Sequence, residues 1–250
     1  MCDSCGCNIT PGNKHLVAEE GKLSRTNSGT DAVEVLQSLL HENDHQALHN
    51  REHLDHHQVL AINLMSSPGA GKTALLEATI DALGDELQIG VIEGDLETEN
   101  DADRIREKGV PACQISTGSA CHLDAHMVHD ALHHLSLDEL DILFIENVGN
   151  LVCPASFDLG HHRNITLLSV TEGDDKPAKY PVIFRAADLM LLTKMDLLPY
   201  LDEFDPARAE HYLRQLSNPA DMISLSAKEG GGMERWIQWL LNEVDQYRQK

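Results

Sequence analysis

The segment Ser66-Ser67-Pro68-Gly69-Ala70-Gly71-Lys72-Thr73 constrains this chain more than any other feature. It follows an apolar run over 59–65, which predicts a strand, and precedes 74–78, which predicts a helix. A glycine-rich turn between a strand and a helix directs backbone N–H groups and a helix N-terminus at one point, where they stabilise a polyphosphate. In such a loop Lys72 reaches the β- and γ-phosphates, and the Thr73 hydroxyl binds Mg²⁺. The segment therefore predicts a site for a nucleoside triphosphate.

From residue 59 onward, short apolar runs alternate with amphipathic segments. This alternation is typical of an α/β fold with a doubly wound, mainly parallel sheet. The candidate strands are 59–65, 89–92, 112–115, 142–146, 165–170, 189–193 and 222–225. A closing helix over 233–249 is expected to carry three apolar side chains on one side: Trp236, Leu240 and Val244.

Composition divides the chain into three parts. Residues 1–30 hold three cysteines among Gly, Ser, Asn and Pro with little apolar periodicity, so we expect a flexible metal-binding tail. Residues 31–58 predict a histidine-rich helix, and residues 59–250 predict the P-loop domain. The apolar positions of the histidine-rich helix are Leu36, Leu39, Leu40, Leu48 and Leu54.

Charge and cysteine content narrow the cellular setting. A formal net charge of −22 repels nucleic acid and anionic lipid, so neither is expected as a partner. No run approaches the roughly 18 apolar residues of a membrane span. The chain has six cysteines and no apolar signal segment, which indicates a reducing cytosol where thiols bind metals or catalyse reactions. We therefore expect a cytoplasmic protein.

Two segments at the ends of predicted strands point to guanine, at the edge where open α/β sheets bind ligands. Thr193-Lys194-Met195-Asp196 resembles the motif Asn-Lys-x-Asp, with threonine in place of asparagine. The Asp196 carboxylate can accept both the ring N–H and the exocyclic amine of guanine, a pattern that adenine lacks. The Lys194 stem is expected to lie along the base. Ser226-Ala227-Lys228 resembles the loop that contacts the guanine carbonyl, and together the two motifs favour GTP over ATP.

Two acidic strand ends complete the predicted hydrolysis apparatus. Asp95 ends Ile-Glu-Gly-Asp and is a suitable partner for Mg²⁺ or for the attacking water. Glu146 and Gly149 lie in a second switch whose usual pattern is Asp-x-x-Gly, and the glycine N–H can sense the γ-phosphate. Phosphoryl transfer depends on positioning and charge neutralisation, so we expect Lys72, Asp95 and Glu146 to be the catalytic residues. No catalytic glutamine or finger arginine is apparent in the sequence, which predicts slow intrinsic hydrolysis.

Cysteines and histidines predict metal chemistry. Cys2, Cys5 and Cys7 form a C-x-x-C-x-C cluster whose thiolates can wrap one soft or borderline ion, and the spacing alone does not separate nickel from zinc. Cys121-His122 and Cys153 form a second candidate site, because Cys153 follows a loop that must move when the γ-phosphate leaves. Cys113 is expected in the core.

The histidines fall mainly in two predicted helices. His41, His45, His49, His53 and His57 recur every four residues, and His122, His126, His129 and His133 form a similar stripe. Adjacent members share a helix face and can chelate in pairs, or they form a solvated polar face. Weak buffering of metal without a dedicated site is the third interpretation.

Together these motifs resemble the HypB family, the hydrogenase nickel-incorporation GTPases of the SIMIBI class. The similarity covers nearly the whole chain: Cys-x-x-Cys-Gly-Cys, Asn-Leu-Met-Ser-Ser-Pro-Gly-x-Gly-Lys-Thr, Ile-Glu-Gly-Asp, Gly-x-x-Cys-His-Leu-Asp-Ala and Glu-Asn-Val-Gly-Asn-Leu-Val-Cys-Pro. Cys2, Cys5 and Cys7 match the family's tight nickel site, and Cys121, His122 and Cys153 match its in-domain metal residues. Ser66 and Glu146 follow family usage, whereas Thr193 departs from it.

The resemblance implies a function that the motifs alone do not. It implies a GTPase that dimerises with nucleotide and delivers Ni²⁺ to the precursor of a [NiFe]-hydrogenase large subunit, together with a zinc-containing HypA-type metallochaperone. GTP, Mg²⁺, Ni²⁺ and Zn²⁺ are the implied ligands. Related GTPases serve urease maturation or protect cobalamin-dependent mutases, and the thiol clusters argue against the mutase role. A non-enzymatic nickel store is a further alternative, which predicts no turnover of GTP.

Overall fold

The structure is a computed structural model that describes residues 30–84, 86–95, 100–118 and 120–249, and only the backbone of residues 30–39. Its described part is built on one sheet of parallel strands in the spatial order β3-β2-β4-β1-β5-β6-β7. The strands are β1 (Leu60–Ser66), β2 (Ile89–Asp95), β3 (Ala112–Ser116), β4 (Ile142–Glu146), β5 (Arg163–Ser169), β6 (Leu189–Thr193) and β7 (Asp221–Ser224). The expected parallel α/β architecture is confirmed.

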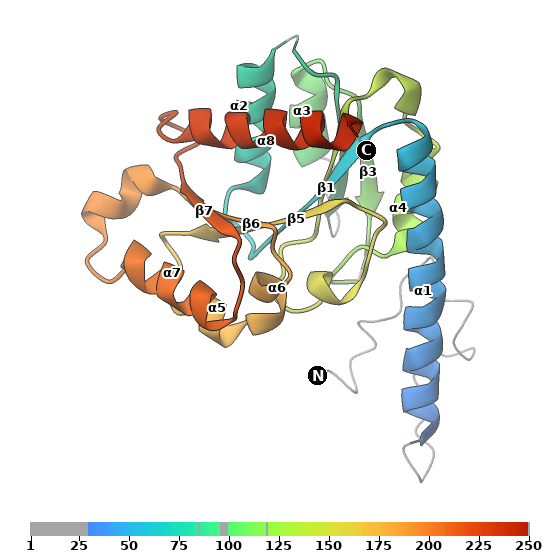
Figure 1. Ribbon diagram of the computed structural model, residues 1–250, viewed down its shortest axis with the longest axis horizontal. Helices are drawn as coiled ribbons and strands as arrows, with labels where there is room; N and C mark the ends of the chain where they lie inside the picture. The colour runs from blue at the N-terminus through green and yellow to red at the C-terminus, as the bar shows by residue number, and fades with distance from the viewer. Residues whose placement is uncertain (1–29, 85, 96–99, 119, 250) are drawn as a thin grey trace.

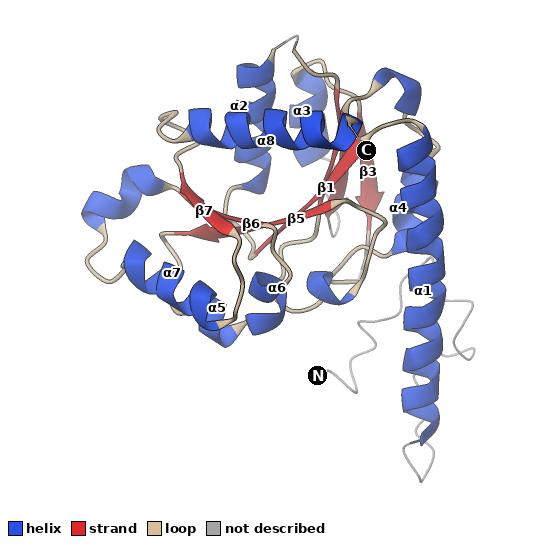
Figure 2. Ribbon diagram, viewed as in Figure 1, coloured by secondary structure: helices blue, strands red, loops and turns tan. Residues whose placement is uncertain are grey.

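Helices cover both faces of this sheet (Figure 1; Figure 2). The α-helices are α1 (Thr30–His56), α2 (Lys72–Leu83), α3 (Asn100–Glu107), α4 (Ala125–Leu132), α5 (Lys176–Lys179), α6 (Pro181–Arg185), α7 (Pro206–Gln215) and α8 (Met233–Arg248). Short 3₁₀ turns are η2 (Leu137–Glu139), η3 (Pro154–Ser156) and η4 (Met195–Tyr200). Helices α2, α3 and α8 pack on one face, and α1, α4, α6 and α7 pack on the other. None of the helices described is both long and apolar enough to cross a membrane.

The apolar runs form strands because both of their faces are buried. Along β1, Ile62 packs under α2 and α8, whereas its neighbour Ala61 packs under α1 and α4. Side chains of a strand alternate between the two faces, so a strand covered on both sides is apolar throughout. On α8 the predicted apolar stripe is buried, and the Trp236 indole N–H donates to Thr79 Oγ1 of α2 at 2.8 Å. This bond satisfies the indole donor inside the core.

One apolar position of α1 differs from the sequence-based expectation. Leu48 is 56% exposed, while its neighbour Ala47 is fully buried. The buried face also contains Asn50, whose amide donates to the backbone carbonyls of Ala125 at 2.7 Å and Leu159 at 3.1 Å. Successive helix residues are about 100° apart, so a helix that buries Ala47 and Asn50 turns Leu48 outward. A buried, fully hydrogen-bonded asparagine takes an inward position that hydropathy assigns to leucine. Cys113, expected in the core, is half-buried in β3.

Candidate nucleotide and metal site

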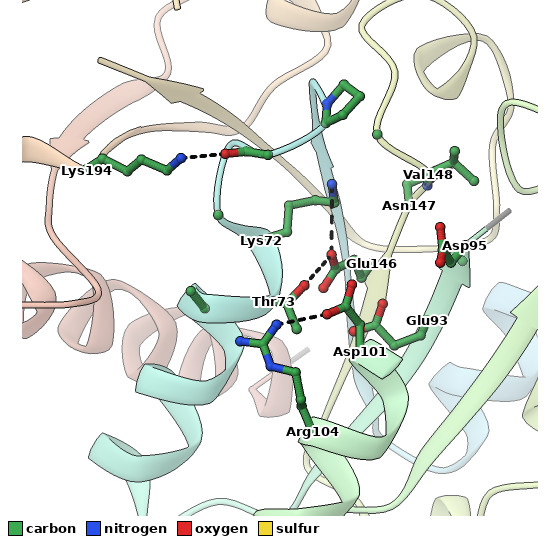
Figure 3. A pocket seen from close by; sticks show the side chains of 16 residues that line it. Lys72, Thr73, Glu93, Asp95, Asp101, Arg104, Glu146, Asn147, Val148 and Lys194 are labelled. Atoms are coloured by element: carbon green, nitrogen blue, oxygen red, sulfur yellow. Dashed lines mark hydrogen bonds and ion pairs between the residues drawn. The ribbon is translucent and has the colours of Figure 1, made fainter. Parts of the chain in front are cut away.

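The phosphate loop joins the carboxyl end of β1 to the first turn of α2. Gly69 has a φ of 73° and Gly71 a φ of 97°, in the left-handed region that side chains disfavour. Gly71 is the N-cap of α2, and no side chain bonds to the free N–H groups of that turn. These donors and the helix N-terminus border one cavity of about 500 Å³ (Figure 3). A concave site with such donors is suited to a polyphosphate.

Lys72 and Thr73 are buried at the base of this cavity. The Lys72 ammonium donates to the Ser66 hydroxyl at 3.1 Å and lies 3.9 Å from Glu146 Oε1. The Thr73 hydroxyl donates to the same Glu146 oxygen at 3.0 Å. Ser66, which stands where a glycine is usual, therefore holds the lysine, and Glu146 faces both loop residues (Figure 3).

Two buried carboxylates meet beside Thr73. Glu93 of β2 and Glu146 of β4 are register partners in the sheet, and both are almost fully buried. Burial and the neighbouring Glu146 charge raise the pKa of Glu93 to about 11. Burial also raises the pKa of Glu146, against the attraction of the Lys72 ammonium. The pair therefore retains a proton at neutral pH, because two adjacent buried charges are unfavourable.

Sequence reasoning missed Glu93. It selected Asp95 because that residue ends its strand, and Asp95 does line the same cavity (Figure 3). The signal for Glu93 was a carboxylate inside an otherwise apolar buried strand, a position that acidic residues take only with a partner or a ligand. Asp101 and Arg104 of α3 also line the cavity and were not predicted.

This donor set fits Mg²⁺. The Oε1 of Glu93 and the Oε2 of Glu146 are buried without a hydrogen-bond partner among the described residues. Magnesium prefers carboxylate and hydroxyl oxygens and binds through one or two carboxylates together with substrate phosphates. The Thr73 hydroxyl and the orphaned carboxylate oxygens match that preference, and their charge suits a cation.

The second-switch segment lies directly against the phosphate loop. A Cβ atom on Gly149 would lie 2.8 Å from the Cα of Pro68, so only glycine permits this approach. Asn147, two residues earlier, is fully buried and donates to Asn63 Oδ1 of β1 at 3.2 Å. Both contacts place the loop after β4 beside the position that phosphates would take.

The predicted base-reading residues meet at the other end of the loop. The Thr193 hydroxyl donates to the backbone carbonyl of Ala70 at 2.7 Å, and the Lys194 ammonium donates to that of Gly69 at 2.6 Å. Thr193, the departure from asparagine, thus connects β6 to the phosphate loop. Asparagine has an amide donor for the same carbonyl, so the substitution keeps the connection.

Asp196 borders a second cavity of about 280 Å³ next to the first, and Ser226 bonds to Asp196. The Ser226 hydroxyl donates to Asp196 Oδ1 at 2.6 Å, which leaves the other carboxylate oxygen for a ligand. Ala227 and Lys228 line this cavity together with Gly71 and Lys194, which the two cavities share. The phosphate loop and the predicted base-reading loop therefore line two adjoining cavities.

The internal cysteines meet although they lie far apart in the chain. Cys121 Sγ is 3.0 Å from Cys153 Sγ and 3.8 Å from His122 Nδ1. The three ligand atoms lie within 4.8 Å of one another, and no other such group occurs in the described ranges. Burial lowers the pKa of His122 to about 4, so its ring is neutral at physiological pH. A neutral imidazole and two thiols form a donor set for a borderline metal ion.

Packing fixes the orientation of His122. Its ring stacks on Phe157 with centroids 4.0 Å apart, and its Nε2 is buried with no hydrogen-bond partner among the residues described. Asn150 Oδ1 accepts from the backbone N–H groups of Val152 and Cys153 at 2.7 and 3.3 Å, which shapes the turn that presents the second thiol. Cys2, Cys5 and Cys7 lie outside the described residues.

Hydrogen bonds from backbone N–H groups connect the loop that carries Cys121 and His122, here called the metal loop, to the nucleotide cleft. The backbone N–H of Leu123, next to His122, donates to Asn147 Oδ1 at 3.2 Å. At the start of the same loop, the N–H of Thr117 donates to the carbonyl of Asp95 at 2.9 Å. Both acceptors belong to strand ends that border the phosphate cavity.

Comparison with known proteins identifies relatives of this chain. Residues 60–224 match the family described as CobW/HypB/UreG, nucleotide-binding domain. The hydrogenase maturation factor HypB of Azotobacter vinelandii is 52% identical over 208 residues, which are 83% of this chain and 68% of that protein. The hydrogenase/urease maturation factor HypB of Helicobacter hepaticus is 45% identical, over 86% of this chain and 89% of that protein. A crystal structure of HypB from Helicobacter pylori in complex with nickel has a TM-score of 0.79 and 41% identity, covering 82% of this chain and 96% of that chain.

Proposed function

This chain belongs to the HypB branch of the CobW/HypB/UreG family, and on that premise we propose that it is a GTP-dependent nickel chaperone. It hydrolyses GTP to GDP and phosphate and delivers Ni²⁺ to the precursor of a [NiFe]-hydrogenase large subunit. Three thiols in the tail stay reduced only in a compartment such as the cytoplasm, where the protein acts.

The phosphate half of the cleft positions GTP for attack by water. The N–H groups of Gly69, Ala70, Gly71 and the first turn of α2 bind the phosphate oxygens. Lys72 exchanges its Ser66 and Glu146 contacts for the β- and γ-phosphates. Gly149, which packs against Pro68, places its N–H at the γ-phosphate. Hydrolysis is slow because positioning and charge neutralisation carry the reaction.

Thr73, Glu146, Glu93 and Asp95 hold Mg²⁺ with the nucleotide. When bound, the ion neutralises charge on the β- and γ-phosphates during transfer. Because the pKa values of Glu93 and Glu146 are raised, the carboxylate pair would have to release its proton to hold the cation. Asp95 orients the attacking water from the strand end.

The base half of the cleft selects guanine. Asp196 accepts from the ring N–H and the exocyclic amine, while the Lys194 stem lies along the base. Lys194 and Ser226 already contact the phosphate loop and Asp196, at 2.6 Å in each case, so the pocket is ordered before the base arrives. Ala227 and Lys228 close the edge that faces the guanine carbonyl.

Nickel is the cargo of this cycle, and it occupies two sites. Cys2, Cys5 and Cys7 hold it tightly in the tail, and Cys121, His122 and Cys153 hold it in the domain. Zn²⁺ accepts the same donors, so it is an alternative occupant of the internal site. The observation that carries the proposal is the pair of hydrogen bonds from this metal loop to Asn147 and Asp95.

Hydrogenase maturation requires partners, which we propose from the family. They are a second copy of this chain, bound when nucleotide or metal is present, a HypA-type metallochaperone and the hydrogenase precursor. Val152, adjacent to Cys153, is 54% exposed and offers an apolar contact beside the metal. A partner protein bound at Val152 would lie next to the metal ion held by Cys153.

One reconstitution separates this proposal from its alternatives. Nickel-loaded protein is incubated with GTP and either the large-subunit precursor or apo-urease, while phosphate release and nickel transfer are measured together. We expect transfer to the hydrogenase precursor that stops when GDP replaces GTP. Preferential transfer of nickel to apo-urease would assign a role in urease maturation. This alternative is specific because the Helicobacter hepaticus relative is named a hydrogenase/urease maturation factor. Nickel binding without phosphate release would identify a storage protein.

A further inference from the structure

Histidines from two helices meet at one interface on the side of the sheet covered by α1 and α4. The two helices lie side by side (Figure 1), and two histidines of each segment contact each other across them. Ring centroids are 5.1 Å apart for His49 and His129 and 6.0 Å apart for His53 and His133. Within one helix, the His129 and His133 rings are 4.6 Å apart. These residues are separate from the thiol cluster around Cys121.

Two of these rings are already spaced as metal ligands. His129 Nε2 lies 3.2 Å from His133 Nε2. With metal–nitrogen bonds of about 2.0–2.1 Å, two nitrogens of a tetrahedral site lie about 3.3 Å apart. Histidines four residues apart on a helix share a face, so the backbone itself sets this spacing.

The surroundings give His129 the ring tautomer that a ligand needs. The Asn50 amide donates to two backbone carbonyls, so its Oδ1 is an acceptor. The Nδ1–H of His129, 3.1 Å away, donates to that oxygen. The lone pair of the ring is therefore on Nε2, which faces His133. A hydrogen bond on the opposite ring nitrogen is the usual support of a metal-bound histidine.

Helix α1 provides the remaining nitrogens. The Nδ1 of His53 is buried and has no hydrogen-bond partner in the part of the chain described here. His57, whose ring centroid is 5.0 Å from that of His53, contacts Asp138 Oδ1 through Nδ1 at 2.7 Å. A buried, unpaired ring nitrogen with other imidazoles around it has no partner except a cation or a water.

We propose that His129 of α4 and His133, the C-cap residue of α4, together with His49 and His53 of α1, bind one divalent cation of the imidazole-preferring class, such as Zn²⁺ or Ni²⁺. His129 and His133 form the first chelate, and rotation about the side-chain bonds of His49 and His53 completes the site. The cation joins α1 to α4. This site contains no thiol, so it differs in chemistry from both cysteine sites.

The test uses the full chain with its thiol sites removed by Cys2→Ala, Cys5→Ala, Cys7→Ala, Cys121→Ala and Cys153→Ala. Isothermal titration with Zn²⁺ and with Ni²⁺ counts the remaining ions. We expect one ion per chain, at least tenfold weaker after His129→Gln with His133→Gln. His45→Gln with His134→Gln, two exposed histidines outside the cluster, is the matched control and should bind as the parent does.

Thermal unfolding provides a second readout. An ion that joins two helices binds the native state selectively, so saturating Zn²⁺ should raise the Tm of the thiol-free parent and of the control. The Tm of the His129/His133 variant should not rise. If that variant fails to fold without metal, His133→Gln alone makes the same comparison, because His133 is exposed. No bound ion in the thiol-free parent, or equal binding in cluster and control variants, would overturn the proposal.

Discussion

The sulfur of Cys121 lies 3.0 Å from the sulfur of Cys153, although 32 positions separate the two residues in the chain. Each thiol is on a loop that leaves the nucleotide edge of the sheet. Leu123, two residues after Cys121, bonds to Asn147, and Gly149, four residues before Cys153, packs on the phosphate loop. A ligand that moves the second-switch loop therefore changes the distance between the two thiols.

This relationship predicts that nucleotide and internal metal affect each other. In a variant whose Cys2, Cys5 and Cys7 are alanine, metal affinity should differ between the GDP-bound and GTP-analogue-bound forms by roughly five- to 150-fold. The reason is linkage: a nucleotide that shifts a ligand atom alters metal affinity, and metal alters nucleotide affinity by the same factor. Competition with a chromophoric chelator measures both affinities.

Cys153→Ala should abolish that difference. Cys113→Ala, on strand β3 away from the cluster, is the matched control and should retain it. Identical metal affinities in both nucleotide states would show that the cluster is only structural. The switch would then act through dimerisation alone.

Base selection is expected to depend on Asp196. Asp196→Asn replaces an acceptor by a donor toward the base, so we expect at least a tenfold loss in GTP affinity and a shift in preference toward xanthosine triphosphate. The Asn Oδ1 can still accept from Ser226, which preserves the loop. Fluorescent-nucleotide titration measures the change, with Asp202→Asn on an exposed neighbouring turn as control. Unchanged GTP affinity would refute the assignment of this loop.

The phosphate loop and the tail are expected to act independently. Lys72→Ala and Thr73→Ala should abolish GTP hydrolysis, because they remove the phosphate cation and the hydroxyl ligand of Mg²⁺. Nickel binding by Cys2, Cys5 and Cys7 should remain. Phosphate release and bound nickel are measured on the same samples. The thermal melting curves of both alanine variants show whether they are folded. A parallel loss of nickel would contradict the separation.

Stability is expected to fall as the pH is lowered, because of a buried histidine away from both sites. Burial lowers the pKa of His161 from its ordinary value of 6.5 to about 4, although Asp158 opposes the shift. Between these pH values the unfolded chain holds a proton on His161 that the folded chain lacks. The contribution of His161 to the free energy of unfolding is therefore complete above pH 6.5 and is lost as the pH falls toward 4. The loss is about 1.4 kcal/mol for each pH unit in this window.

Urea unfolding at pH 6.5 and pH 5 measures this loss. His161→Gln should make the free energy of unfolding less dependent on pH in this range, since glutamine takes up no proton. His45→Gln, at an exposed position, should leave it as in the parent. If the free energy of unfolding changes equally with pH in the parent and in His161→Gln, His161 does not control stability in acid.

Sequence reasoning was most informative where one contiguous segment contains all the necessary groups. The strand before Ser66, the turn at Gly69 and Gly71, and the helix from Lys72 follow each other in the chain, and the structure forms them in that order. Strand ends were predicted within three residues, because apolar runs stop where burial stops. The histidine stripe of α1 was visible as well, but its role was not.

Hydropathy was misleading where a polar residue is buried by specific bonds. Leu48 was expected inside and is exposed, because Asn50 and its two carbonyl acceptors determine the orientation of α1. Glu93 was missed for a related reason. Its importance comes from Glu146 on the adjacent strand, and no local pattern reports which strand is adjacent.

By itself, the sequence determined the parallel α/β architecture and the phosphate loop, since backbone donors of one continuous segment form that loop. Only the tertiary structure decided which distant residues meet. The order β2-β4-β1 places Glu93 beside Glu146, and the packing of α1 on α4 brings His53 to His133. Contacts of this kind depend on strand order and helix packing, which are set by the free energy of the whole core and leave no periodicity in the chain.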